Sequence, residues 1–133
     1  MKLRFGITKK ESTPTTSINW TKLTDMTVLD QIKEESKKSP ILILKHSTRC
    51  PTSSMALNRL ERNWDSSKVS DLKHYYLDLI SYRDISNQIA ADFSILHQSP
   101  QVLIISDGKC VYNASHMGVS FAEIENVVSG QPA

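Results

Sequence analysis

The chain alternates between short apolar runs and longer stretches in which apolar residues recur at helical spacing. The two clearest runs, Ile41–Leu44 and Val102–Ile105, have the length and the aliphatic content of strands that are buried on both faces. Shorter or more polar strands are expected at Ile18–Leu23, Lys73–Leu79 and Lys109–Ala114. These segments predict a sheet whose inner strands are covered on both sides.

Helices are expected between and after these strands. They run from Thr24 or Asp25 to Lys38, from Pro51 to Trp64, from Ser81 to Phe93, and from Ser120 to just before Gly130. A proline at the first helical position, such as Pro51, is already set in the required conformation. Ser120 and Glu123 have the spacing of a capping box. The predicted element order is therefore β-α-β-α-β-α-β-β-α.

This order predicts an α/β fold with a mixed sheet and helices on both faces. Helical crossovers between the first strands imply parallel pairing, while Asp107-Gly108 predicts a hairpin that adds an antiparallel strand. Residues 1–17 are polar, with a possible short strand at Leu3–Ile7, and we interpret them as a tail. Residues 18–133 are interpreted as one domain.

Composition excludes several functional classes. The 133 residues carry a formal net charge of +2 and no basic run, which argues against a nucleic-acid partner held through phosphate contacts. No apolar stretch approaches the roughly 18 residues of a membrane span. The basic segment Met1–Lys10 is not followed by an apolar one, so we expect neither a signal peptide nor membrane association. The expected location is cytoplasmic.

Cys50 stands where a buried strand gives way to a helix. Backbone N–H groups are unpaired at a helix N-terminus and carry a partial positive charge. They stabilise a thiolate, which is the form that attacks disulfides. Arg49, and Lys45 and His46 just upstream, are expected to add positive field. Cys50 is therefore the candidate nucleophile, although a buried cysteine before a proline can also be a packing residue.

The segment Cys50-Pro51-Thr52-Ser53 has the spacing of a C-x-x-C motif with serine in the second place. A second cysteine would attack the mixed disulfide and release the substrate, which a serine cannot do near neutral pH. An adduct on Cys50 must then wait for an external thiol. The Ser53 hydroxyl either donates a hydrogen bond to the thiolate or is an ordinary polar residue of a first turn.

The remaining cysteine and the histidines give weaker signals. Cys110 lies in a predicted strand and is either a packed residue or a distant resolving cysteine. The histidines lack the spacing of metal ligands, so we expect no metal and no bound cofactor. His46 and His116 are candidates for the rim of the active site, and surface or packing roles are expected for the others, His74 and His97.

Four blocks in the same order give the chain a resemblance to a known family. They are Lys45–Ser53 (KHSTRCPTS), Tyr82–Asn87 (YRDISN), His97–Val102 (HQSPQV) and Ala114–His116 (ASH). On these blocks the chain resembles the YtxJ-type family of bacillithiol-system proteins, which are monothiol bacilliredoxins with a thioredoxin-like fold. The resemblance covers about Trp20 to Val128. Gln98 stands where the family is expected to have glutamate.

The resemblance implies a site and a reaction. It implies removal of bacillithiol, a malate-bearing glucosaminyl cysteine, from S-bacillithiolated client proteins, with bacillithiol as the thiol co-substrate. It also implies a cis-proline at Pro100, although most X-Pro bonds are trans. The implied catalytic residues are Cys50 and Ser53, and the implied substrate-binding residues are Arg49, Pro51, Thr52, Ser99, Pro100 and His116. Arg49, with Lys45 or His116, would suit the malate carboxylates.

Three other functions compete with this one. The chain can be a general monothiol disulfide reductase, or an adaptor of the same fold that binds partners without turnover. An iron–sulfur carrier of the monothiol-glutaredoxin kind is disfavoured, because Pro51 follows Cys50 where those proteins have glycine, and because only Gly118 is present in place of their paired glycines.

Overall fold

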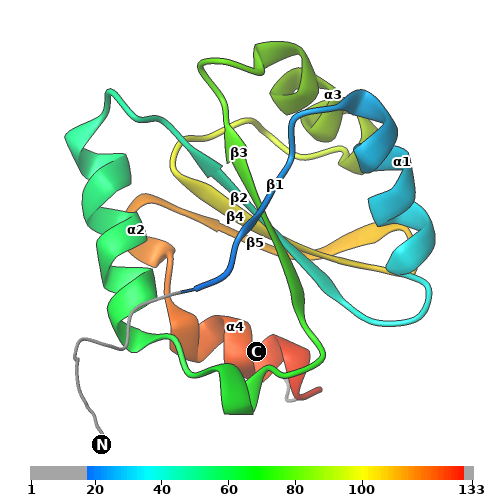
Figure 1. The fold of residues 1–133 in the computed structure, drawn as a ribbon, viewed down its shortest axis with the longest axis vertical. Helices are drawn as coiled ribbons and strands as arrows, with labels where there is room; N and C mark the ends of the chain where they lie inside the picture. The colour runs from blue at the N-terminus through cyan, green and yellow to red at the C-terminus, as the bar shows by residue number, and fades with distance from the viewer. Residues whose placement is uncertain (1–17, 131–133) are drawn as a thin grey trace, which may run out of the picture.

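A mixed five-stranded sheet with strand order β1-β3-β2-β4-β5 forms the centre of the structure (Figure 1). The structure is a computed structural model and describes residues 18–130, so the predicted tail and its strand at Leu3–Ile7 lie outside the described residues. The strands are β1 (Thr21–Lys22), β2 (Ile41–His46), β3 (Lys73–Asp78), β4 (Gln101–Ser106) and β5 (Lys109–Ser115). β1, β3 and β2 are parallel, whereas β4 is antiparallel to both β2 and β5.

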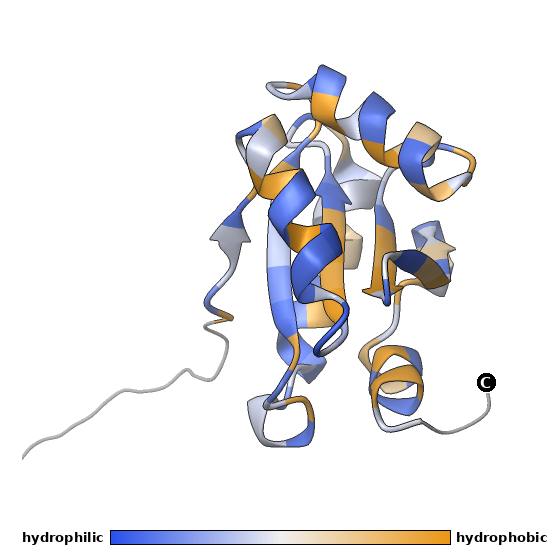
Figure 2. Cartoon of the chain, turned by 90° about the vertical axis from the view of Figure 1, so that its right-hand side faces the viewer, coloured by the Kyte–Doolittle hydropathy of each residue, from blue (hydrophilic) through white to orange (hydrophobic). Residues whose placement is uncertain are grey.

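Helices cover both faces of this sheet, as predicted. They are α1 (Met26–Glu35), α2 (Pro51–Asn63), α3 (Arg83–Phe93) and α4 (Phe121–Val128), with 3-10 turns η2 (Ser66–Lys68) and η3 (His116–Gly118). Alternate residues of β2 face opposite sides: Ile41 and Ile43 pack with α1 and α3, and Leu42 and Leu44 pack with α2 and α4. Figure 2 shows the hydrophobic positions along the inner strands and alternating with polar ones on the helices. Within residues 18–130, no helix has both the length and the apolar character needed to cross a bilayer.

β2 is longer than the apolar run that predicted it. Lys45 and His46, which follow the apolar run Ile41–Leu44, continue the strand and are buried, with 0% and 5% of their surface exposed. β2 lies between two strands, and Lys45 pairs with Leu77 of β3 and with Gln101 of β4. Because both neighbours continue the hydrogen-bond ladder at this level, the strand extends past its last aliphatic residue.

The hairpin between β4 and β5 confirms the prediction made from Asp107-Gly108. Both residues have positive φ, 54° and 74°, as a two-residue turn of type I′ requires. The turn also ends α1, since Asp107 N–H donates to the Ser36 carbonyl and Gly108 N–H donates to Ser36 Oγ, each at 2.8 Å. α1 therefore ends at Glu35, short of the predicted Lys38.

Two helix starts differ from the prediction. α3 begins at Arg83 because Ser81 instead bonds backwards, its Oγ donating to Asp78 Oδ2 at 3.0 Å. Ser120 does precede α4, but its side chain makes no capping hydrogen bond, so the predicted capping box is wrong. Local sequence propensity predicted both helices correctly, but it did not predict that the Ser81 side chain would bond to Asp78.

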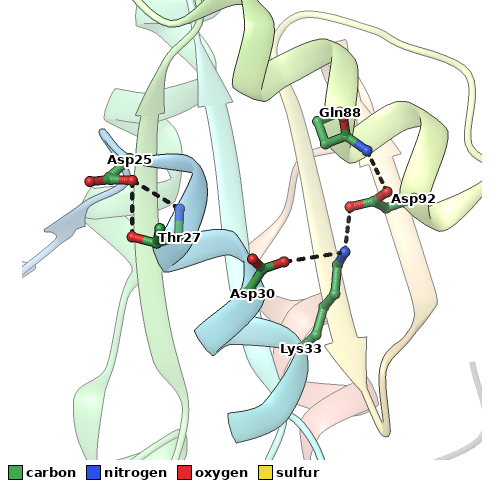
Figure 3. Close-up of polar contacts among 6 residues, drawn as sticks. All are labelled: Asp25, Thr27, Asp30, Lys33, Gln88 and Asp92. Atoms are coloured by element: carbon green, nitrogen blue, oxygen red, sulfur yellow. Dashed lines mark hydrogen bonds and ion pairs between the residues drawn. The ribbon is translucent and has the colours of Figure 1, made fainter.

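An ion pair ties together the two helices on one face of the sheet (Figure 3). Lys33 of α1 contacts the Asp92 carboxylate of α3 at 2.5 Å, and Gln88 donates to the same carboxylate at 2.6 Å. The start of α1 is capped by Asp25, whose Oδ1 accepts from Thr27 N–H at 2.9 Å. These contacts fix α1 and α3 along the face opposite to α2.

Candidate active site

Cys50 occupies the N-cap position of α2. Its backbone is extended, Pro51 follows at the first helical position, and its N–H donates to the Ser47 carbonyl at 3.2 Å. The residue is half-buried. Arg49, Pro51 and Thr52 beside it are exposed. Cys50 therefore stands at the start of α2, where the first backbone N–H groups of a helix have no partner within it.

Ser53 lies one turn into α2 and is fully buried. Its Oγ accepts a hydrogen bond from Ser47 N–H at 3.1 Å and lies 2.8 Å from His46 Nδ1. The sequence left two interpretations of Ser53 open, a hydrogen bond to the Cys50 thiolate or an ordinary polar residue of the first turn; within residues 18–130 the contacts of its hydroxyl are these two. His46, predicted at the rim, is instead buried against Ser53, and no pattern in the sequence indicated this pair.

Pro100 lies at the same end of the sheet as Cys50. The Ser99–Pro100 peptide bond is cis, the isomer that the resemblance implies. Gln101 pairs with Lys45, so Pro100, which precedes Gln101, lies beside the end of β2 from which the chain leads to Cys50. Within the described part of the chain, the buried Ser99 hydroxyl has no hydrogen-bond partner.

His116 is exposed and lies against the Pro100 segment. Its backbone N–H donates to the Pro100 carbonyl at 3.1 Å, and its Nε2 lies 3.0 Å from Gln98 Oε1. Arg59 of α2 donates to the carbonyls of His116 and Val119 at 3.3 and 3.1 Å. The structure therefore joins η3, α2 and the Pro100 segment around one end of the sheet.

Lys45 was predicted to add positive charge near Cys50. Its side chain instead points to the face of the sheet opposite to α2. Its Nζ donates to the Ser86 carbonyl at 3.1 Å and lies 3.2 Å from His97 Nδ1. Burial lowers the pKa of Lys45 to about 8. The pKa of His97 is lowered, mainly by partial burial of its ring and to a lesser extent by the positive charges of Lys45 and Arg83.

Gln101 also holds the segment before Pro100. It is buried, its Nε2 donates to the Leu96 carbonyl at 3.1 Å, and its Oε1 accepts from Gln98 N–H at 3.4 Å. Lys45 and Gln101 are paired neighbours on β2 and β4. Two buried polar side chains thus hold the loop that leads to the cis-proline from within the sheet.

Cys110 is at the other end of the sheet from Cys50. Cys110 pairs with Ile105, and Ile105 pairs with Ile41, which is the first residue of β2. Cys50, in contrast, comes after the last residue of β2. The ends of a six-residue strand are about 16 Å apart, and a disulfide needs Cα atoms within about 7 Å. Cys110 Sγ donates to the Tyr112 carbonyl at 3.3 Å, and burial raises the pKa of its thiol. In this structure Cys110 cannot resolve an adduct on Cys50.

Comparison with known proteins agrees with this architecture. A protein described as an oxidoreductase with a thioredoxin fold is 30% identical over 78% of this chain and 88% of its own, with a TM-score of 0.66. Thioredoxin from Malassezia sympodialis (14% identity, 92% and 98% coverage, TM-score 0.65) and a poplar thioredoxin h mutant (17%, 84% and 81%, 0.63) share the fold.

The family model described as monothiol bacilliredoxin BrxC matches residues 21–124. This range contains all four of the sequence blocks that carry the resemblance, together with Cys50 and the cis-proline loop. The chain therefore belongs to the monothiol bacilliredoxin family.

Proposed function

We propose that this protein removes bacillithiol from S-bacillithiolated proteins by thiol–disulfide exchange at Cys50. One observation carries the proposal: Cys50 stands, half-buried, at the N-terminus of α2, and the other cysteine of the chain lies at the far end of the sheet. A thiol redox function agrees with the family and with the thioredoxin-fold oxidoreductase that resembles the chain. The arrangement favours a cycle that uses one protein thiol.

The cycle has two exchange steps. In the first, the Cys50 thiolate attacks the bacillithiol sulfur of the client mixed disulfide, a new S–S bond forms, and the client leaves as a thiolate that takes a proton from water. In the second, the thiolate of a small thiol attacks the adduct and releases the Cys50 thiolate. Each step breaks one disulfide and forms another, so no further oxidant or reductant is needed.

Recognition of bacillithiol would use the exposed cationic and polar groups around Cys50. Arg49 is adjacent and exposed, and a guanidinium group binds a carboxylate through two parallel hydrogen bonds. Ser99 precedes the cis-proline and is half-buried, and the exposed His116 lies against Pro100 through its backbone N–H. We propose that Arg49 binds a malate carboxylate while backbone groups of Ser99 bind the client.

Intact-mass analysis tests the reaction directly. The reduced protein is mixed with a bacillithiolated client, and the expected result is one bacillithiol on this chain and an equal loss from the client. Cys50→Ser should transfer nothing, whereas the matched control Cys110→Ser should behave as wild type. A glutathionylated client, run in parallel, separates a bacillithiol-specific protein from a general disulfide reductase. A client that keeps its bacillithiol in the presence of wild type would overturn the proposal.

A further inference from the structure

Four large apolar side chains are exposed in the described part of the chain, and three of them are on segments at the Cys50 end of the sheet. Leu96 and Met117 each have 80% of their surface exposed, and Met55 has 64%. The fourth, Val111, is on β5 at the other end. Single exposed apolar residues are common, whereas apolar residues gathered on one face indicate a contact surface.

Hydrogen bonds join the first two of these segments, α2 and η3. Met55 is one turn before Arg59 on α2, so the two side chains are on the same face of the helix. The Arg59 guanidinium donates to the carbonyls of His116 and Val119, on either side of Met117. Figure 1 shows this orange segment beside α2. The face of α2 that carries Met55 therefore borders the turn that carries Met117.

The loop before the cis-proline, which is the third segment, is joined to η3 through His116. The His116 backbone N–H donates to the Pro100 carbonyl at 3.1 Å, and its Nε2 lies 3.0 Å from Gln98 Oε1. Leu96 is two residues before Gln98, and its carbonyl accepts from Gln101 Nε2 at 3.1 Å. The three apolar side chains are thus carried by segments that contact one another in sequence.

The backbone of His116 also fixes part of this surface. Its φ of 54° is in the left-handed region, which is unfavourable for a residue with a side chain. The N–H, the ring and the carbonyl of His116 are each bonded to another segment, and these contacts maintain the conformation. Because Met117 follows directly, they also determine where its side chain leaves the backbone. This part of the surface is therefore formed before a partner binds.

The chemistry of the surface suits the protein half of a mixed disulfide and not the bacillithiol half. Thioether and leucine side chains offer no strong hydrogen bonds to sugar hydroxyls or malate carboxylates, so covering those groups here would cost desolvation free energy. Apolar side chains of a polypeptide carry no such cost, and methionine adapts its shape to different neighbours. Exchange at Cys50 also requires the sulfur of the client, and the chain that bears it, to approach this end of the sheet.

We propose that Met55, Leu96 and Met117 dock a protein client through apolar residues beside its modified cysteine. The inference rests on Cys50 being the nucleophile of the proposed function, and it assigns the two exchange steps to different surfaces. In the first step the client covers the three side chains while its sulfur leaves as a thiolate. In the second step the attacking group is a small thiol, no polypeptide is present, and the surface is not used.

Single-turnover kinetics separate the two steps. The triple variant Met55→Ser, Leu96→Ser, Met117→Ser is mixed with a bacillithiolated client protein, and the appearance of bacillithiol on Cys50 is followed by intact mass after acid quenching. The rate constant of this step should fall about tenfold, the factor expected for losing the burial of roughly one apolar side chain. Release of bacillithiol from the isolated adduct by a small thiol should keep its wild-type rate. Val111→Ser, the matched control, should leave both rates unchanged.

Oxidised bacillithiol has no protein half and should react with the triple variant at the wild-type rate. A first step that is unchanged in the triple variant, or an equal fall in both steps, contradicts the inference. A wild-type dimer that dissociates in the triple variant, measured by sedimentation, also contradicts it, because a second copy would then occupy the surface.

Failure of the proposed function gives a different result, since wild type would then accept no bacillithiol. Docking is in that case measured with the same client protein linked through a disulfide to 2-nitro-5-thiobenzoate, whose release is followed by absorbance. The triple variant should react more slowly than wild type with this client and equally fast with the free aromatic disulfide. Equal rates with the linked client would rule out the docking surface.

Discussion

Replacing Lys45 with methionine isolates the effect of burying an amine. The Lys45 side chain has no exposed surface, and burial lowers its pKa from 10.5 to about 8. Below pH 8 the native protein holds a protonated amine in this site, while the unfolded chain holds its proton up to about pH 10.5. Between these values the unfolded state binds more protons, so the contribution of Lys45 to stability rises with pH.

The magnitude follows from the two pKa values. The free energy of unfolding of wild type, relative to Lys45→Met, should rise by about 2 to 3 kcal/mol between pH 7 and pH 10. The loss of the hydrogen bond to the Ser86 carbonyl lowers the stability of the variant by a nearly constant amount at every pH. It therefore shifts the difference in free energy of unfolding between the two proteins without changing how that difference varies with pH. The slope, and not the value at one pH, therefore reports the buried charge.

Urea unfolding followed by circular dichroism at a series of pH values measures this slope. Taking the difference between the two proteins removes the contribution of groups common to both, including the tyrosines that ionise at high pH. Lys38→Met, which removes an exposed amine, is the control and should give a curve without this rise. A flat difference between wild type and Lys45→Met from pH 7 to pH 10 would refute the reasoning.

Three further outcomes are expected. Asp92→Asn breaks the ion pair with Lys33 and should lower the free energy of unfolding by about 1 kcal/mol, less at high salt, as measured by urea denaturation. Ser53→Cys places a second thiol one turn after Cys50, and mild oxidation should then give a species two mass units lighter, about the mass of two hydrogens; an unchanged mass would contradict the placement. Brief treatment with iodoacetamide at pH 7 should label Cys50 alone in the native protein, and Cys110 only after unfolding, because burial raises the pKa of the Cys110 thiol.

The fold was predictable because the signals for it are local. The apolar run Ile41–Leu44, the proline at the start of α2 and the Asp107-Gly108 turn each specify a structure within a few residues, and together they gave the element order. The position of Cys50 at a helix N-terminus follows from the same local pattern. Assigning a family then depended on four short blocks in the right order.

The buried polar groups were not predictable for the opposite reason. The predicted strand ended with the apolar run at Leu44, since lysine is almost never fully buried without a partner, and the partners of Lys45, Ser86 and His97, are 41 and 52 residues away along the chain. His46 was misplaced in the same way. Only the pairing of β2 with both neighbours shows that these side chains lie inside.

The distance between the two cysteines has a consequence for how such a protein behaves in a cell. With Cys50 and Cys110 at opposite ends of β2, the chain can hold an oxidising equivalent only as a group attached at its surface. The lifetime of that group is set by how often a free thiol arrives, and no internal rearrangement can shorten it. The fraction of the protein that carries such a group on Cys50 would therefore depend on the concentration of free small thiol around it.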